Sequence, residues 1–216
     1  MSPTIKKYFE NVNIAQSKLF GKSFINNLKK NIKILPIQAG DLSKYPMDLL
    51  LDFLKSDIYI VYGSSYIKGD LSNFLVERRA INIHAGVSPY YRGSDCNFWA
   101  LYDDNSHLAG STIQLLSKGL DNGPILYHSM SNINTNPFEY TMSTVKSAFH
   151  SLAERIKDNS LFRIDPIVQD NSREIRYSRK NEFNEEIIIK YFKKKINLNN
   201  KIFDNSLLNK PFFLNN

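Results

Sequence analysis

The sequence is poor in the residues that build disulfide frameworks and metal clusters. Cys96 is its only cysteine, and it has four histidines. A single cysteine excludes an intrachain disulfide and a cysteine-based zinc cluster, and the histidines have no partners at metal-ligand spacing. We therefore expect no resident metal, and we interpret Cys96 as a buried or half-buried thiol.

Long hydrophobic runs, repeats and low-complexity linkers are also missing. No apolar run approaches the roughly 18 residues of a membrane-spanning helix, and the first residues lack the pattern of a signal peptide. We therefore expect no membrane contact and a cytoplasmic location. With 216 residues, of which 42% are hydrophobic, the chain is too apolar to be disordered and long enough for one domain with an appendage.

Charge of one sign is in excess, since the formal net charge is +7 and the isoelectric point is near 9.3. The basic residues concentrate outside the central part of the chain, at 29–30, 173–180 and 190–195. Charge alone indicates non-specific attraction and not mechanism. We interpret these runs as solvated helix faces and consider nucleic acid an unlikely partner, with an anionic partner as the alternative.

What the sequence does contain is a polar stretch between residues 80 and 127. Residues 81–84 alternate apolar and polar as a strand does, and Gly86 and Gly93 then interrupt regular structure. On an extended backbone Asn82 and His84 project to the same face. An amide N–H and an imidazole N–H aimed at one point can stabilise charge on a carbonyl oxygen.

A carboxylate for this face can come from Asp121. It lies in a glycine-flanked loop, residues 119–124, which can return its side chain toward His84. Taken singly, each residue has a more common structural interpretation: His84 as a satisfied histidine in a polar loop, and Asp121 as the cap of a turn.

Taken together, four ordered motifs change this balance. They are Asn82-Ile83-His84, Ser88-Pro89-Tyr90-Tyr91-Arg92-Gly93, Gly110-Ser111-Thr112-Ile113 and Gly119-Leu120-Asp121-Asn122-Gly123. In this order they resemble the formyltransferase family that uses 10-formyltetrahydrofolate as donor. The resemblance implies that Asn82 and His84 hold an oxyanion and that Asp121 orients His84 and accepts a proton.

A second polar segment follows the apolar run 57–62, which is typical of a buried parallel strand. Ligands of open α/β sheets bind beyond the carboxyl ends of the strands, although an ordinary turn explains the two serines equally well. The resemblance implies that this segment lines the folate pocket, largely through backbone groups. Its residues are Gly63, Ser64, Ser65, Tyr66 and Ile67.

The loop after His84 supplies candidate residues for the acceptor substrate. Tyr90, Tyr91, Arg92 and Trp99 can present aromatic walls and a guanidinium to a phosphate or a nucleotide. The alternative for Trp99 is a core anchor.

The predicted fold is α/β: a Rossmann-like, formyltransferase-like, mainly parallel sheet flanked by helices. We expect a divergent helical segment at 1–30, a catalytic core at 31–165 and a short C-terminal extension at 166–216. The resemblance does not extend to roughly the first 30 residues, so we expect the sheet to lack the strands that come first in the family. The expected strands are 32–38, 57–62, 81–84, 110–116, 124–130 and 175–177, and the expected helices are 45–55, 68–79, 97–102, 138–156 and 185–195.

The implied reaction is formyl transfer from 10-formyltetrahydrofolate to a primary amine. The short C-terminal part and the Asn97-Phe98-Trp99 motif favour a nucleotide-linked amino sugar as acceptor, followed by glycinamide ribonucleotide and then methionyl-tRNA. A non-catalytic folate- or nucleotide-binding relic is the alternative of a different class. A homodimer stays open.

Overall fold

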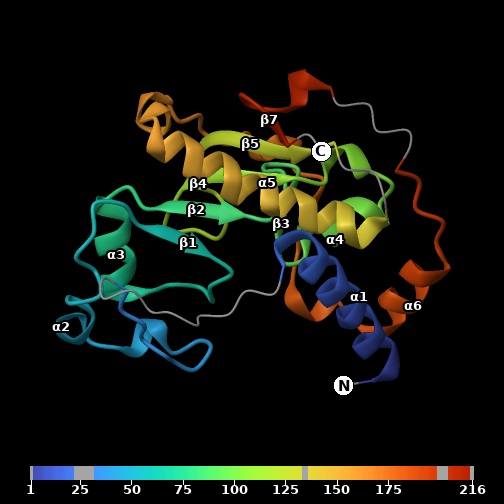
Figure 1. Ribbon diagram of the computed structural model, residues 1–216, viewed down its shortest axis with the longest axis horizontal. Helices are drawn as coiled ribbons and strands as arrows, with labels where there is room; N and C mark the ends of the chain where they lie inside the picture. The colour runs from blue at the N-terminus through green and yellow to red at the C-terminus, as the bar shows by residue number, and fades with distance from the viewer. Residues whose placement is uncertain (1, 22–31, 133–135, 199–203, 215–216) are drawn as a thin grey trace.

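The computed structural model describes residues 2–21, 32–132, 136–198 and 204–214, which form a mixed sheet with helices packed on it (Figure 1). The helices are α1 (Pro3–Phe20), α2 (Met47–Leu50), α3 (Gly69–Glu77), α4 (Cys96–Tyr102), α5 (Pro137–Lys157) and α6 (Glu185–Lys193). The strands are β1 (Ile60–Tyr62), β2 (Ile81–His84), β3 (Tyr91–Gly93), β4 (Ser111–Leu115), β5 (Ile125–Ser131), β6 (Arg176–Ser178) and β7 (Phe212–Leu214). Short 3₁₀ helices span Leu42–Lys44, Ser106–Leu108, Ser160–Arg163, Asn171–Arg173, Lys180–Glu182 and Asn205–Leu207.

The main sheet has the strand order β1-β2-β4-β5-β7. β1 and β2 are parallel and joined through α3, as expected for a strand–helix–strand unit. β4 is antiparallel to both β2 and β5. The β4–β5 pair is antiparallel because a short loop joins these two strands. β7 pairs parallel with β5. The expected α/β class is confirmed, with parallel pairs on the outside and antiparallel pairs in the centre.

One face of this sheet is covered by α5 (Figure 1). The helix begins where Asn136 accepts a hydrogen bond from the backbone N–H of Glu139 at 2.8 Å, with Pro137 at the first helical position. Its apolar side packs on β2, β4 and β5. The buried residues of this contact are Ile81, Ile83, Ile113, Leu126, Tyr127, Ala148 and Leu152. The polar side chains of β2 are left for the opposite face.

Two predictions for residues 32–55 are wrong. The expected strand at 32–38 has no regular secondary structure, and Pro36 lacks the N–H that a ladder requires. The expected helix at 45–55 is reduced to the four residues of α2, of which only Leu50 is buried. The run 57–62 does form a parallel strand, but a shorter one. Within the described residues it is the edge of the sheet, and Ile60 is 48% exposed.

The two ends of the chain pack on the core. The helical prediction for 1–30 is confirmed over α1, while residues 22–31 lie outside the described part. Tyr8 of α1 packs its ring against Phe138 of α5 and Tyr191 of α6. In the extension, β6 pairs with β3, and β7 joins the main sheet. The described residues after Asp165 therefore contribute strands to both sheets, through β6 and β7.

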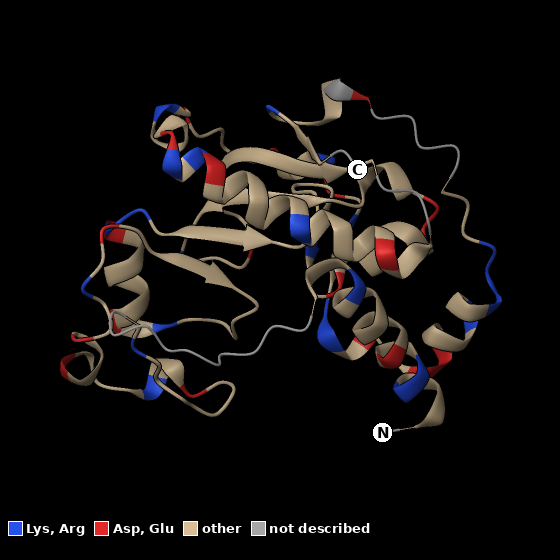
Figure 2. Ribbon diagram, viewed as in Figure 1, with Lys and Arg blue, Asp and Glu red and all other residues tan. Residues whose placement is uncertain are grey.

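Acidic and basic residues both lie on α1 and on α5 (Figure 2). Among the described helices, none combines the length and the apolar character of a membrane span. Within the same residues, no group of three or more His, Cys, Asp or Glu side chains is arranged to hold a metal ion.

His128 of β5 connects the C-terminal segment to the loop after β2. Its Nδ1 accepts a hydrogen bond from the backbone N–H of Asn209 at 2.8 Å, so its Nε2–H donates to the carbonyl of Ser88 at 2.8 Å. This pattern requires the neutral ring. Burial lowers the pKa of His128 to about 4.

Acid is therefore expected to weaken this connection. An unfolded histidine titrates near pH 6.5, so the unfolded chain binds the proton first and the stability falls as the pH drops from about 6.5 toward 4. Between about pH 7.5 and about pH 5, we expect wild type to lose about 2 kcal/mol more unfolding free energy than His128→Asn. Urea unfolding at both pH values measures this, and equal losses in the two proteins would contradict it.

Candidate active site

The end of β2 places two polar side chains on the face away from α5. Ile81 and Ile83 are 4% and 3% exposed in the core, so the alternating residues Asn82 and His84 face the other way. The imidazole of His84 is itself buried, at 6% exposure. The predicted pairing of Asn82 and His84 on one face agrees with the structure.

The loop between β4 and β5 brings Asp121 to this pair. One carboxylate oxygen, Oδ1, lies 3.3 Å from Nδ2 of Asn82 and 3.4 Å from Nδ1 of His84. Asp121 has a left-handed backbone with φ of 49°, which Asp tolerates better than most residues. Gly123 allows the loop to close, because a Cβ there would lie 1.8 Å from the carbonyl oxygen of Leu115.

The hydrogen-bond partners of His84 determine its charge. Nδ1 faces the carboxylate of Asp121, and Nε2 lies 3.0 Å from the carbonyl oxygen of Tyr91. Both partners can only accept, so both ring nitrogens have to donate, which only the imidazolium does. Burial opposes this charge, but the neighbouring Cys96 and Asp121 together raise the pKa of His84 well above its ordinary value.

Asp121 is the matching anion. Burial favours its neutral form, but the charge of His84 and the hydrogen bonds from His84, Asn82 and the backbone of Gly93 together lower its pKa. The site is thus a buried ion pair in which an amide shares the carboxylate. The two contacts of Oδ1 are long for hydrogen bonds.

Cys96 is a neighbour of His84 that the sequence patterns did not indicate. It begins α4 and is 2% exposed, as expected for a buried thiol. Gly86 lies between the two side chains: an added Cβ would come within 2.5 Å of the Cβ of Cys96 and 2.6 Å of Nε2 of His84. A residue with a side chain therefore does not fit at position 86.

A pocket of about 290 Å³ opens beside the ion pair. Asn82, His84 and Asp121 line it together with all five residues predicted to bind the cofactor. These are Gly63, Ser64, Ser65, Tyr66 and Ile67. Further lining residues that the sequence reasoning missed include Ser72, Ser94, Gln114 and Ser117. The hydroxyl of Tyr66 donates a hydrogen bond to the carbonyl of Lys118. This bond connects the 63–67 segment with the loop between β4 and β5 across the pocket.

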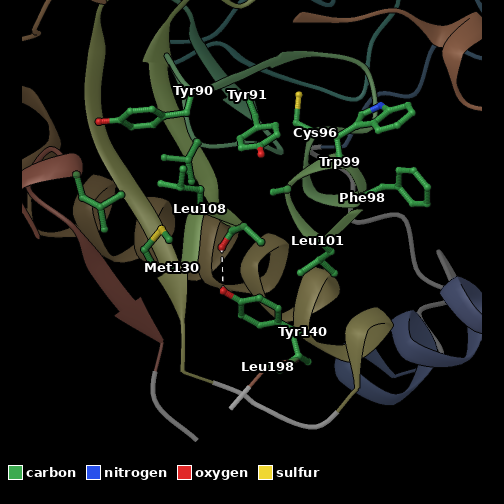
Figure 3. Packing of buried hydrophobic residues seen from close by; sticks show 14 of the residues in the cluster. Tyr90, Tyr91, Cys96, Phe98, Trp99, Leu101, Leu108, Met130, Tyr140 and Leu198 are labelled. Carbon is green, nitrogen blue, oxygen red and sulfur yellow. Dashed lines mark hydrogen bonds between the residues drawn. The ribbon is translucent and has the colours of Figure 1, made fainter. Parts of the chain in front are cut away.

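The residues predicted to bind the acceptor lie elsewhere. Tyr90, Tyr91 and Trp99 are at most 4% exposed and belong to the core around α4 (Figure 3), and none of them lines the pocket. For Trp99, the alternative of a core anchor agrees with this position, and the guanidinium of Arg176 stacks on its ring at 4.2 Å. Large aromatic side chains gain more by burying their apolar area in the core than by lining an open pocket.

Arg92, the fourth of these residues, is engaged by other parts of the chain. Its Nη1 donates to Glu174 at 2.9 Å and to Asn171 at 3.1 Å, and its Nη2 donates to the carbonyl of Leu120 at 3.3 Å. It therefore supports the loop that carries Asp121 and is not open to a substrate phosphate.

The comparisons with known proteins assign more than half of the chain to one family. The profile of the family described as formyl transferase matches residues 41–158, which include Asn82, His84 and Asp121. A methionyl-tRNA formyltransferase of Trichodesmium erythraeum is 25% identical over 82% of this chain, and one of Finegoldia magna is 38% identical over 36% of it. The chain spans 61% and 24% of the lengths of these two proteins.

Two solved structures of formyltransferases have a similar fold. The formyltransferase PseJ of Anoxybacillus kamchatkensis, solved with a UDP-linked formamido sugar and tetrahydrofolate, is 21% identical with a TM-score of 0.50, covering 77% of this chain and 80% of its own. A sugar N-formyltransferase of a Shewanella species is 16% identical with a TM-score of 0.53, covering 84% and 75%.

Proposed function

Because the chain belongs to the formyl transferase family, we propose that it transfers a formyl group from 10-formyltetrahydrofolate to a primary amine. The observation that carries this proposal is the group of the buried His84 with the partly buried Asn82 and Asp121, which opens on the same pocket as residues 63–67. An imidazolium, an amide and a carboxylate within contact of one another are what acyl transfer to an amine requires.

The chemistry of the pocket fits a folate donor. Its walls combine apolar side chains, such as Val61, Ile67 and Leu115, with serine hydroxyls and the backbone groups of the 63–67 loop. A pteridine ring is flat and apolar on its faces and carries hydrogen-bonding groups along its edge. The backbone and hydroxyl groups would bind that edge, and the apolar walls would cover the faces.

In the proposed mechanism, the protein stabilises charge and moves one proton. The amine nitrogen forms a bond to the formyl carbon, and the carbonyl oxygen becomes an oxyanion. The second N–H of Asn82 and the positive charge of His84 stabilise this oxyanion. Asp121, held as a carboxylate, accepts the proton that the amine loses. The bond between the formyl carbon and N10 of the folate donor then breaks, and the proton on Asp121 passes to N10.

For the acceptor, we propose an amine on a nucleotide-linked sugar. PseJ, which has the same fold, was solved with such a product, whereas the curated relatives are methionyl-tRNA formyltransferases. Glycinamide ribonucleotide and methionyl-tRNA are therefore the alternative acceptors. A folate-binding protein without catalysis is the alternative of a different class.

A direct assay tests this proposal. The purified chain is incubated with 10-formyltetrahydrofolate and one candidate acceptor at a time. The acceptors are a panel of UDP- and dTDP-linked amino sugars, glycinamide ribonucleotide and methionyl-tRNA. The formylated product is identified by mass spectrometry. We expect product from an amino sugar. Titration calorimetry with 5-formyltetrahydrofolate is the companion measurement: binding without any product would favour the non-catalytic protein, and no binding by a folded chain would overturn the proposal.

A further inference from the structure

The residue that holds the Asp121 loop most directly comes from the C-terminal extension. Gln169 lies 48 residues after Asp121 and is 8% exposed. The segment is attached to the sheet just before it, where Ile167 and Ile125 exchange two backbone hydrogen bonds of 2.8 Å. It continues into the 3₁₀ helix Asn171–Arg173.

The amide of Gln169 faces three oxygen atoms. Its Nε2 lies 2.9 Å from the carbonyl of Asp121, 2.8 Å from the carbonyl of Gly123 and 2.8 Å from Oε1 of Gln114. Backbone carbonyls only accept hydrogen bonds, so the NH₂ end of the amide has to face the loop. Its own Oε1 is buried and has no hydrogen-bond partner in the described part of the chain. Burying this unpaired oxygen costs free energy, and the hydrogen bonds that Nε2 donates to the loop offset this cost.

The same segment supports the loop a second time. Glu174 and Asn171 hold the guanidinium of Arg92, which donates to the carbonyl of Leu120, the residue before Asp121. Arg92 directly follows Tyr91, whose carbonyl accepts the Nε2–H of His84. Residues 169–174 thus connect both sides of the ion pair.

We propose that Gln169 is a positioning residue that holds the carboxylate of Asp121 against His84 and Asn82. This inference rests on the proposed function for its effect on turnover, but not for its effect on His84. The contacts of Oδ1 at 3.3 and 3.4 Å are at the long limit of hydrogen bonding. A small displacement of the loop therefore breaks them, and the left-handed backbone of Asp121 does not hold the position by itself.

The test uses Gln169→Met, which keeps the volume and the neutral charge and removes both donors. Gln169→Asn keeps the amide but shortens its reach, so it gives an intermediate case. The matched control is Asn209→Leu, which removes an amide of the same extension that donates to the carbonyl of Leu126 at 3.0 Å, away from the pocket. All proteins are compared by thermal unfolding before the other measurements.

The first readout is the titration of His84, followed by NMR of the imidazole in the protein without substrates. Asp121 and Cys96 face this ring, and His128 adds a nearby titratable group. With Asp121 displaced, we expect the pKa of His84 to fall in Gln169→Met, because the ring loses its anionic partner, to fall by less in Gln169→Asn and to stay unchanged in Asn209→Leu.

The second readout is turnover. We expect kcat of Gln169→Met to fall roughly 10- to 100-fold with the KM for the folate donor nearly unchanged, since misplaced groups cost rate and not ground-state binding. An unchanged His84 titration in a folded Gln169→Met protein would overturn the inference. If wild type makes no product with any acceptor but the titration shifts as expected, the positioning role stands and the proposed function fails.

Discussion

Asp121→Asn is expected to reduce formyl transfer by roughly 10³-fold, because it removes the proton acceptor and the partner of the imidazolium in one step. The change is nearly isosteric, and asparagine adopts the left-handed conformation of this residue as readily as aspartate. The loop is therefore expected to keep its path. The measurement is kcat with saturating donor and acceptor, together with the melting temperature.

A control separates the loss of chemistry from the loss of a surface charge. Asp158→Asn removes a carboxylate that is exposed and accepts a hydrogen bond from the backbone N–H of nearby Ser160 at 2.8 Å. We expect it to retain turnover near that of wild type. Equal rates in Asp121→Asn and Asp158→Asn would mean that Asp121 is not the proton acceptor. Loss of folate binding in Asp121→Asn would instead indicate that the carboxylate shapes the pocket.

Gly93→Ala is expected to destabilise the fold by about 3 kcal/mol or more. A Cβ at this position would lie 2.0 Å from the carbonyl oxygen of Ser178, where β3 pairs with β6, and the φ of 92° is unfavourable for any L residue. Neither strand can shift easily, because the contact atom belongs to the backbone. With total stabilities of about 5–15 kcal/mol, this change removes a large share.

Gly40→Ala is the matched control for this effect. Gly40 has the same φ of 92° but no atom within 4 Å of the added Cβ. It therefore reports the cost of the backbone conformation alone, which is about 1–2 kcal/mol. Chemical unfolding of both variants measures the difference between them. Equal destabilisation would mean that β3 and β6 separate at little cost, and the extension would then not be part of the core.

The grouping of Asn82, His84 and Asp121 was predictable because its signals are local. The two-residue spacing of Asn82 and His84 gives a common face in any extended strand, and the glycines around Asp121 indicate a loop wherever they occur. The 63–67 segment follows a strand, and its place at the pocket follows from the general geometry of α/β sheets. The same local argument predicted that the side chains of Tyr90, Tyr91, Arg92 and Trp99 contact a substrate. In the folded protein the three aromatic side chains pack in the core, and Arg92 supports the loop of Asp121.

The sequence by itself determined the α/β class, the order of the central elements, and the grouping of Asn82 with the ion pair of His84 and Asp121. The tertiary structure alone decided what holds them: Gln169 on the loop of Asp121, Glu174 on Arg92 and Asn209 on His128. These partners are 48, 82 and 81 residues apart in the chain. Periodicity and turn residues report the conformation of a few neighbouring residues. Which distant amide meets a buried carbonyl depends on how the elements pack, and only the folded chain brings them together.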